Sequence, residues 1–158
     1  MTPTEFRPDD PLNRAQTASL ITNIMGISDP SADYGFIDVN RPDWFFTAVN
    51  TARRHHLMTG TGEGTFSPNL NIPRDQMIAI TARILRREMN YRNPVNAMTY
   101  LHIFADADEL ADWSLMDLAL ASRENLIMRR ADGLFMPNQV ITRGEAAIIL
   151  HRLYRRIW

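Results

Sequence analysis

Three arginines carry the chemistry that this sequence suggests, and each occupies the same place in a repeated block. Arg14, Arg74 and Arg143 each follow a phenylalanine by eight residues and a proline by six. We expect each arginine in the first turn of a helix, where the helix dipole disfavours a cation by roughly 0.3–1 kcal/mol. A guanidinium beside free helix N–H groups makes a good carboxylate site, so the pattern predicts anion binding.

A second block precedes two of the three copies. It reads Phe-x-Asp followed by Asp-Trp, with Asp38 and Trp44 in one copy and Asp106 and Trp113 in the other. Trp44 to Phe66 and Trp113 to Phe135 both span 22 residues, so the spacing between the blocks is kept as well. A fixed internal period is typical of supersecondary units that bury their apolar faces against one another.

The order of these blocks closely resembles the S-layer homology module of bacterial surface proteins. Asn13-Arg14-Ala15-Gln16 and Thr142-Arg143-Gly144-Glu145 match its Thr-Arg-Ala-Glu signature, and the resemblance covers nearly the whole chain. The resemblance implies an all-α fold in which helical repeats form one pseudo-threefold domain over residues 1–158. The repeats would be 1–30, which holds only the second half of a unit, 31–92 and 93–158.

The resemblance also implies a non-catalytic module that anchors a protein to the bacterial cell wall. In that family the arginine contacts the ketal-pyruvate carboxylate of a secondary cell-wall polysaccharide. Asp38 and Asp106 would accept sugar hydroxyls or orient the arginine, and glycines would let the backbone approach the ligand. The candidate ligand-binding residues are Arg14, Arg74, Arg143, Asp38, Asp106, Trp44, Trp113, Gly60, Gly62, Gly64 and Gly133.

Each candidate also has a structural interpretation. The arginines would then bridge to Asp38 and Asp106, in a helical repeat scaffold that binds another protein and no glycan. We favour ligand binding for the arginines. For Trp44 and Trp113 we favour a place in the core, because tryptophan in a repeat helix is more often buried than exposed. The glycines are mainly turn residues under either interpretation.

The repeats leave one binding groove incomplete, since there are two Asp-Trp heads for three arginine blocks. If a groove pairs an arginine with the next head, Arg143 lacks a partner; if pairing is within a unit, Arg14 does. Self-association could complete the truncated repeat. In the last unit Arg129-Arg130-Ala131 replaces Gly60-Thr61-Gly62, which adds side chains where the family tolerates little bulk.

Composition excludes several classes of protein. All seventeen basic residues are arginine, so a Walker-type phosphate loop and a lysine Schiff base are impossible. There is no cysteine, and the formal net charge is −1. We expect no cofactor, no metal, no nucleic-acid partner, no membrane insertion and no enzymatic activity. The N-terminus does not resemble a secretory signal, so we expect a fragment of a larger exported protein located at the bacterial cell surface.

Capping signals predict where the helices begin. Asn13 with Gln16 and Thr142 with Glu145 predict capped helices, the first over residues 14–25. Pro73 takes the capping position in the middle copy, so that helix should lack a side-chain cap. A further helix is expected after Asp43. We expect about five main helices, no significant sheet, and a connector over residues 90–100.

Overall fold

The computed structural model of the chain describes residues 5–127 and 129–158. The elements of this part of the chain are α1 (Arg14–Met25), α2 (Phe46–Arg54), α3 (Arg74–Met89), α4 (Met98–Leu101), the 3-10 helix η1 (Ala107–Glu109), α5 (Leu115–Arg123) and α6 (Arg143–Ile157). Isolated bridges are the only β-type pairings between these residues. The all-α fold is confirmed, with five helices of nine residues or more.

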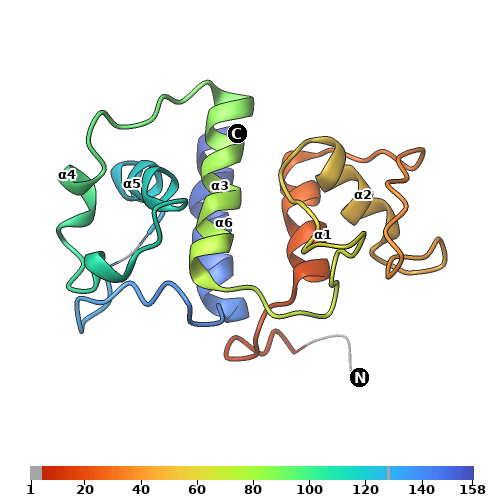
Figure 1. Cartoon of the computed structure of the whole chain (residues 1–158), viewed down its shortest axis with the longest axis horizontal. Coiled ribbons are helices and arrows are strands. Elements are labelled where there is room, and N and C mark those ends of the chain that lie inside the picture. The colour runs from red at the N-terminus through yellow and green to blue at the C-terminus, as the bar shows by residue number, and fades with distance from the viewer. Residues whose placement is uncertain (1–4, 128) are drawn as a thin grey trace. The chain divides into compact units, whose positions relative to one another are not determined.

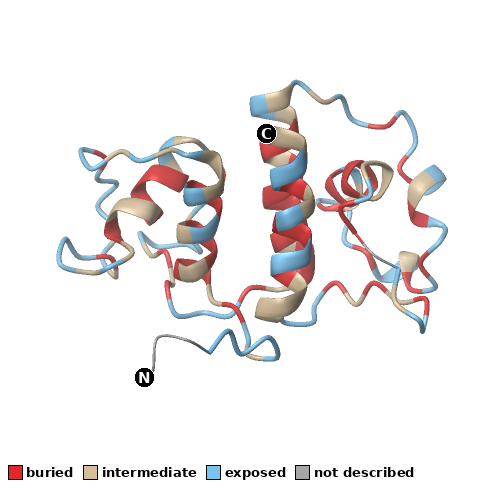
Figure 2. Cartoon of the chain, turned by 180° about the vertical axis from the view of Figure 1, so that it is seen from behind, coloured by how far each residue is buried: buried red, intermediate tan, exposed pale blue. Residues whose placement is uncertain are grey.

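Two compact units divide the described residues (Figure 1). Pro11–Ile72 forms one unit, in which α1 packs against α2, and Ile21 of α1 and Val49 of α2 are buried. The other unit joins residues 5–10 to Pro73–Trp158, and in it α3 packs against α5 and α6 while α4 packs against α5. Figure 2 shows buried residues along one side of the longer helices and exposed residues along the other, as amphipathic helices require.

The predicted capping signals operate in the structure. The Asn13 side chain accepts from the Gln16 N–H while Gln16 Oε1 accepts from the Asn13 N–H, at 2.8 and 3.1 Å. Thr142 and Glu145 form the same reciprocal pair at the start of α6. Helix α3 follows Pro73 and has no side-chain cap at that position. These starts place Arg14, Arg74 and Arg143 as the first residues of their helices.

The two tryptophans lie just before helices α2 and α5 and not inside them. Trp44 belongs to a turn in which the Asp43 N–H donates to the Asn40 carbonyl and the Asn40 N–H donates to the Asp43 carboxylate. The exposed fractions are 66% for Trp44 and 54% for Trp113. The expectation that both belong to the core is therefore wrong, because each helix begins only after its tryptophan.

The Phe-x-Pro turns have an unusual backbone. The residue before each proline is left-handed, with φ of 49° at Arg7, 57° at Ser67 and 59° at Met136. Residues other than glycine rarely adopt this conformation, so it needs support from its surroundings.

An aspartate of the same repeat supports two of these turns. Asp38 accepts the backbone N–H groups of Phe66 and Ser67 at 2.8 and 2.7 Å. Asp106 accepts those of Phe135 and Met136, both at 2.7 Å. Each carboxylate fixes the peptide before and after its phenylalanine, and therefore the direction of the phenylalanine carbonyl.

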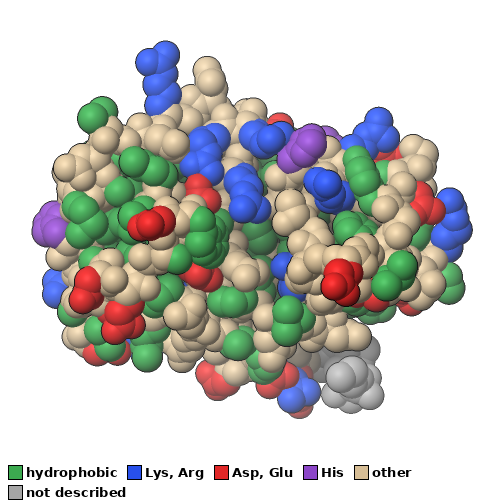
Figure 3. All heavy atoms as spheres, in the orientation of Figure 1, with side chains coloured by type: hydrophobic (Ala, Val, Ile, Leu, Met, Phe, Trp, Pro, Cys, Tyr) green, Lys and Arg blue, Asp and Glu red, His purple; other side chains and the backbone are tan. Residues whose placement is uncertain are grey.

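Arginines occupy the last turns of α3 and α6, where the helix dipole favours a cation. Figure 3 shows basic side chains gathered toward this end of the two helices. Some of them are paired, as Arg86 with Asp117 and Arg156 with Glu124.

The expected connector over residues 90–100 is irregular except at its end, where α4 begins. Among the described residues, no helix has both the length and the apolar content of a membrane span.

Replacing Asp106 by alanine tests the support of the third turn. The change leaves the N–H groups of Phe135 and Met136 without their acceptor, and an unpaired buried donor costs about 1–3 kcal/mol. We expect D106A to lower the free energy of unfolding by about 2–4 kcal/mol in urea denaturation. The exposed neighbour variant D108A is the control, expected within about 0.5 kcal/mol of the wild type. Equal stability of D106A and D108A would contradict this role.

Candidate functional site

The three helix-starting arginines make the same long-range contact. The Nε–H of each donates to the carbonyl oxygen of a phenylalanine in another block. The N···O distances are 2.8 Å from Arg14 to Phe66, 2.8 Å from Arg74 to Phe135 and 2.9 Å from Arg143 to Phe6. The guanidinium carbons also lie over the rings of these phenylalanines, 4.6, 5.4 and 5.6 Å from the centroids. Each arginine is therefore held by a carbonyl dipole and an aromatic face together.

The helix N–H groups beside the arginines are already used. In each helix the first N–H donates to the carbonyl two residues after the proline of the contacted block, and the second N–H donates to the carbonyl of that proline. The pairs are Arg14–Leu70, Ala15–Pro68, Arg74–Gln139, Asp75–Pro137, Arg143–Asp10 and Gly144–Pro8, at 2.8 to 3.2 Å. Side chains of Asn13, Asp75 and Thr142 accept the third N–H. The expectation that free helix N–H groups help to bind an anion is wrong, because neighbouring carbonyls and caps satisfy them.

The aspartates are not ion-paired with the arginines. The carboxylate oxygens of Asp38 and Asp106 accept hydrogen bonds from backbone N–H groups of the phenylalanine turns. Their action on the arginines is indirect, because they fix the carbonyl that accepts the Nε–H. Within residues 5–127 and 129–158, none of the three arginines forms the direct ion pair with Asp38 or Asp106 that the structural interpretation predicts. The ion pair of Arg74 is with Glu145.

Arg14 combines burial with one unused nitrogen. Its exposed fraction is 6%, and its Nη2 donates to the Thr59 carbonyl at 2.6 Å. Nη1 makes no hydrogen bond within residues 5–127 and 129–158, yet no fully buried side-chain nitrogen or oxygen there lacks a partner. Nη1 therefore reaches solvent. Burial lowers the pKa of the Arg14 guanidinium, and the charge of Asp38 acts in the opposite direction.

The glycine loop follows directly after Thr59. A Cβ on Gly60 would lie 2.5 Å from the Thr65 carbonyl oxygen, and Gly62 and Gly64 have φ of 129° and 76°. The Thr61 N–H donates to the Thr65 carbonyl, which closes the turn. The glycines serve the turn, as expected, and the places that a Cβ on Gly62 or Gly64 would take are open.

Arg74 lies in a different environment, although its Nε contact is the same. Its Nη1 donates to Glu145 Oε1 at 2.6 Å, and Arg130 Nη1 lies 3.6 Å from the same oxygen. A cavity of about 120 Å³ adjoins this cluster. It is lined by Arg74, Leu126, Ile127, Arg129, Arg130, Glu145, Ile148 and Ile149.

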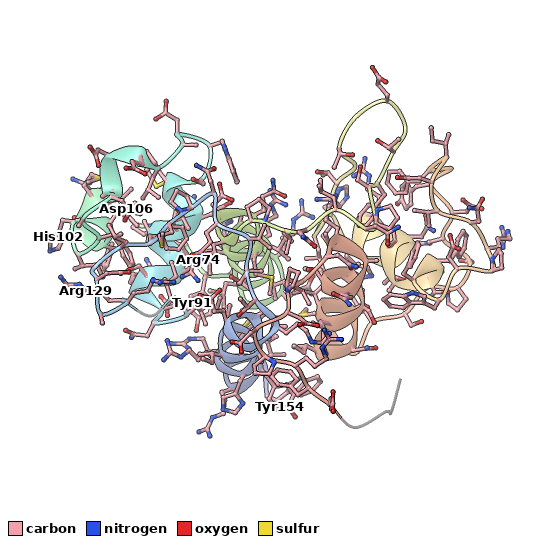
Figure 4. All side chains as sticks on the ribbon, turned by 90° about the horizontal axis from the view of Figure 1, so that it is seen from below. Arg74, Tyr91, His102, Asp106, Arg129 and Tyr154 are labelled. Carbon is pink, nitrogen blue, oxygen red and sulfur yellow. The ribbon has the colours of Figure 1, made fainter. Side chains whose placement is uncertain are left out.

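The substituted glycine loop of the last repeat crowds the same region. Arg129 matches Gly60, and its Nη2 lies 3.3 Å from the place that a Cβ on Gly133 would take. Gly133 itself has φ of 76°, so it remains a turn residue. Figure 4 shows Arg74 at the start of α3, on the side of the unit where Arg129 and Asp106 also lie. The added bulk predicted at this loop is therefore next to Arg74.

Arg143 contacts the first block, which has no Phe-x-Asp head before it in this sequence. Gly144 allows close approach, since a Cβ there would lie 3.1 Å from Pro8 Cβ. The structure thus favours pairing of each arginine with the following block: Arg14 with the second, Arg74 with the third, and Arg143 back to the first. The Phe-x-Pro block of the truncated first repeat therefore has its arginine partner, Arg143, in the same chain.

Sequence reasoning missed the acceptors of the arginine nitrogens, which are the phenylalanine carbonyls, the Thr59 carbonyl and Glu145. The Thr59 carbonyl carries no sequence signal, because every residue has a carbonyl. Glu145 and Arg130 do have a signal, since they replace Gln76 and Thr61 at matched positions of the preceding repeat. Glu145 was interpreted only as a capping residue, and its charge was given no role.

With this geometry established, comparison with known proteins assigns the family. The S-layer homology domain matches residues 36–78 and 103–147, which is more than half of the chain. The chain belongs to the S-layer homology domain family. Each matched segment runs from a Phe-x-Asp head to the helix that follows the next Phe-x-Pro turn. The division into three repeats within one pseudo-threefold domain stays a prediction.

Several relatives share this segment as a small part of their length. The amylopullulanase of Thermoanaerobacterium thermosulfurigenes is 28% identical over 99% of this chain, which covers 8% of that protein. A cell surface protein of Thermoanaerobacter kivui is 29% identical over 94% of this chain and 17% of its own length. The cellulosome-anchoring protein of Acetivibrio thermocellus is 26% identical over 68% and 23%. Because the chain spans under a quarter of each, the enzyme name among them does not describe this segment.

The site contains one residue whose ionisation should affect stability. Asp75, the second residue of α3, has an exposed fraction of 6%. Burial raises the pKa of its carboxyl group, while the hydrogen bond from the Gln76 N–H acts against that rise. A carboxyl group with a raised pKa favours the folded state while protonated, and this contribution is lost as pH rises through the folded-state pKa.

We expect D75N to remove this pH dependence. Asparagine keeps an oxygen for the Gln76 N–H and is uncharged at every pH. Thermal unfolding should show D75N with a higher Tm than the wild type at about pH 7 and a similar Tm at about pH 3, below the unfolded-state pKa of aspartate. The exposed D108N serves as control. A wild-type Tm above that of D75N at neutral pH would contradict the unfavourable burial of the Asp75 charge.

Proposed function

We propose that this chain is a non-catalytic cell-wall-anchoring module that binds secondary cell-wall polysaccharide through the carboxylate of a pyruvylated sugar. The observation that carries the proposal is the position of Arg14, whose guanidinium is buried but keeps Nη1 at the solvent boundary without a protein partner. A ligand carboxylate placed there would complete the hydrogen bonding of a cation that is already ordered. Charge-assisted bonds of this kind are about twice as strong as neutral ones.

Family membership and the names of relatives support anchoring at the cell surface. The relatives from T. kivui and A. thermocellus are named as a cell surface protein and a cellulosome-anchoring protein. Each is similar to this chain over most of this chain's length. A module that recurs as a small part of otherwise different proteins fits a shared attachment role. The location that follows is the bacterial cell surface or cell wall.

The repeat whose phenylalanine carbonyl Arg14 contacts offers groups that suit a carbohydrate. The places that a Cβ on Gly62 or Gly64 would take are open, and Trp44 from the same repeat presents an exposed indole. An indole offers an apolar face and an N–H donor, a combination that suits a sugar ring. The alternative, a helical scaffold that binds another protein, draws its support from the internal use of the arginine Nε groups.

Sedimentation with purified sacculi of the source organism distinguishes these functions. The proposal predicts that the chain pellets with sacculi and stays in solution after mild acid has removed pyruvate ketals. Trp44→Ala should weaken binding to untreated sacculi by about tenfold, which corresponds to ~1.4 kcal/mol. Tyr154→Ala on α6, another partly exposed aromatic residue, is the matched control and should bind as the wild type.

Two results would contradict the proposal. Undiminished binding to acid-treated sacculi would show that the carboxylate is not recognised. Absence of binding to untreated sacculi by a folded chain would favour the protein scaffold. Circular dichroism of each variant establishes that the helical fold is kept.

A further inference from the structure

We infer that the Glu145 carboxylate occupies the anion position beside Arg74, so that the groove at Arg74 is closed by the protein itself while the groove at Arg14 stays open to a ligand carboxylate. This inference rests on the proposed function of that groove. It concerns a difference between two arginines whose Nε contacts are the same.

The geometry of Glu145 is that of a bound carboxylate. Oε1 accepts from Arg74 Nη1 at 2.6 Å and faces Arg130 Nη1 at 3.6 Å. Oε2 accepts the Thr142 N–H at 3.1 Å. The Arg74 side chain is 7% exposed and the Glu145 side chain is 29% exposed. The ion pair is partly buried, and its partner is fixed in place by the helix cap.

Helix capping alone does not explain the charge of Glu145. At the matched position of the first repeat, Gln16 makes the same reciprocal cap with its amide oxygen. Gln76 takes this position in the second repeat. A neutral amide is therefore enough for the cap. The charge of Glu145 suits the helix dipole, and it also pairs with Arg74 and Arg130.

An external carboxylate would compete poorly at Arg74. It would have to replace an internal carboxylate that needs no association step, or bind next to it as a like charge. Arg129 and Arg130 also stand where the second repeat has Gly60 and Thr61, and Arg130 is bound to Glu145 and Asp132. The Nη2 of Arg14 is bound to the neutral Thr59 carbonyl, and the nearby Asp38 uses both its oxygens for the N–H groups of Phe66 and Ser67.

The variant E145Q tests this inference. Glutamine preserves the cap in the form seen at Gln16, while it removes the charge beside Arg74. The probe is a methyl glycoside of a hexosamine that carries a pyruvate ketal, titrated into the whole chain in a calorimeter. We expect the wild type and the control E88Q to bind the same number of equivalents, and E145Q to bind one equivalent more. Equal numbers of equivalents bound by the wild type and by a folded E145Q would overturn the inference.

A second measurement does not depend on the sugar. Sodium acetate should raise the Tm of E145Q more than that of the wild type, relative to sodium chloride at the same ionic strength, because acetate can take the place of the lost carboxylate at Arg74. Equal responses to acetate would overturn the inference. Failure of all variants to bind the glycoside, together with an acetate response confined to E145Q, would instead overturn the proposed function and leave the role of Glu145 supported.

Discussion

The bond from an arginine Nε–H to a phenylalanine carbonyl is the interaction on which the rest of this structure depends. It joins residues that are 52, 61 and 137 positions apart in the chain. In two repeats the peptide group that contains this carbonyl donates its N–H, that of Ser67 or Met136, to Asp38 or Asp106. The carboxylate, the peptide and the guanidinium thus form a row of hydrogen bonds that polarise one another. Hydrogen bonds to charged groups contribute about 1.5–3 kcal/mol each, so this row also offsets the cost of placing a cation at a helix start.

This arrangement divides the arginine between structure and recognition. Nε and the ring contact serve the fold, whereas the Nη atoms are available for another acceptor. A lysine could not do both, because its single ammonium lacks the planar fork. For Arg14 the Nη2 acceptor is the Thr59 carbonyl, and for Arg74 the Nη1 acceptor is Glu145. Arginines with the same Nε contact therefore differ in the partners of their Nη atoms.

The sequence predicts the helix starts well because each is encoded locally. Asn13 with Gln16, and Thr142 with Glu145, are signals contained in one turn, and the structure confirms both. The surroundings of the arginines are predicted less well. Their acceptors are backbone carbonyls, which no residue type reveals, and they come from blocks distant in the chain. The sequence predicts Trp44 to be buried in a helix, but the turn at Asp43 delays the start of α2 until Phe46 and leaves the indole exposed.

Hydrogen exchange at the arginine Nε–H groups, followed by NMR, tests the central interaction most directly. The account predicts that the Nε–H of Arg14 and of Arg74 exchanges at least about tenfold more slowly than that of the exposed Arg87, because both are buried and bound to carbonyls. Equal exchange rates for the three arginines would contradict the claim that these bonds hold the blocks together.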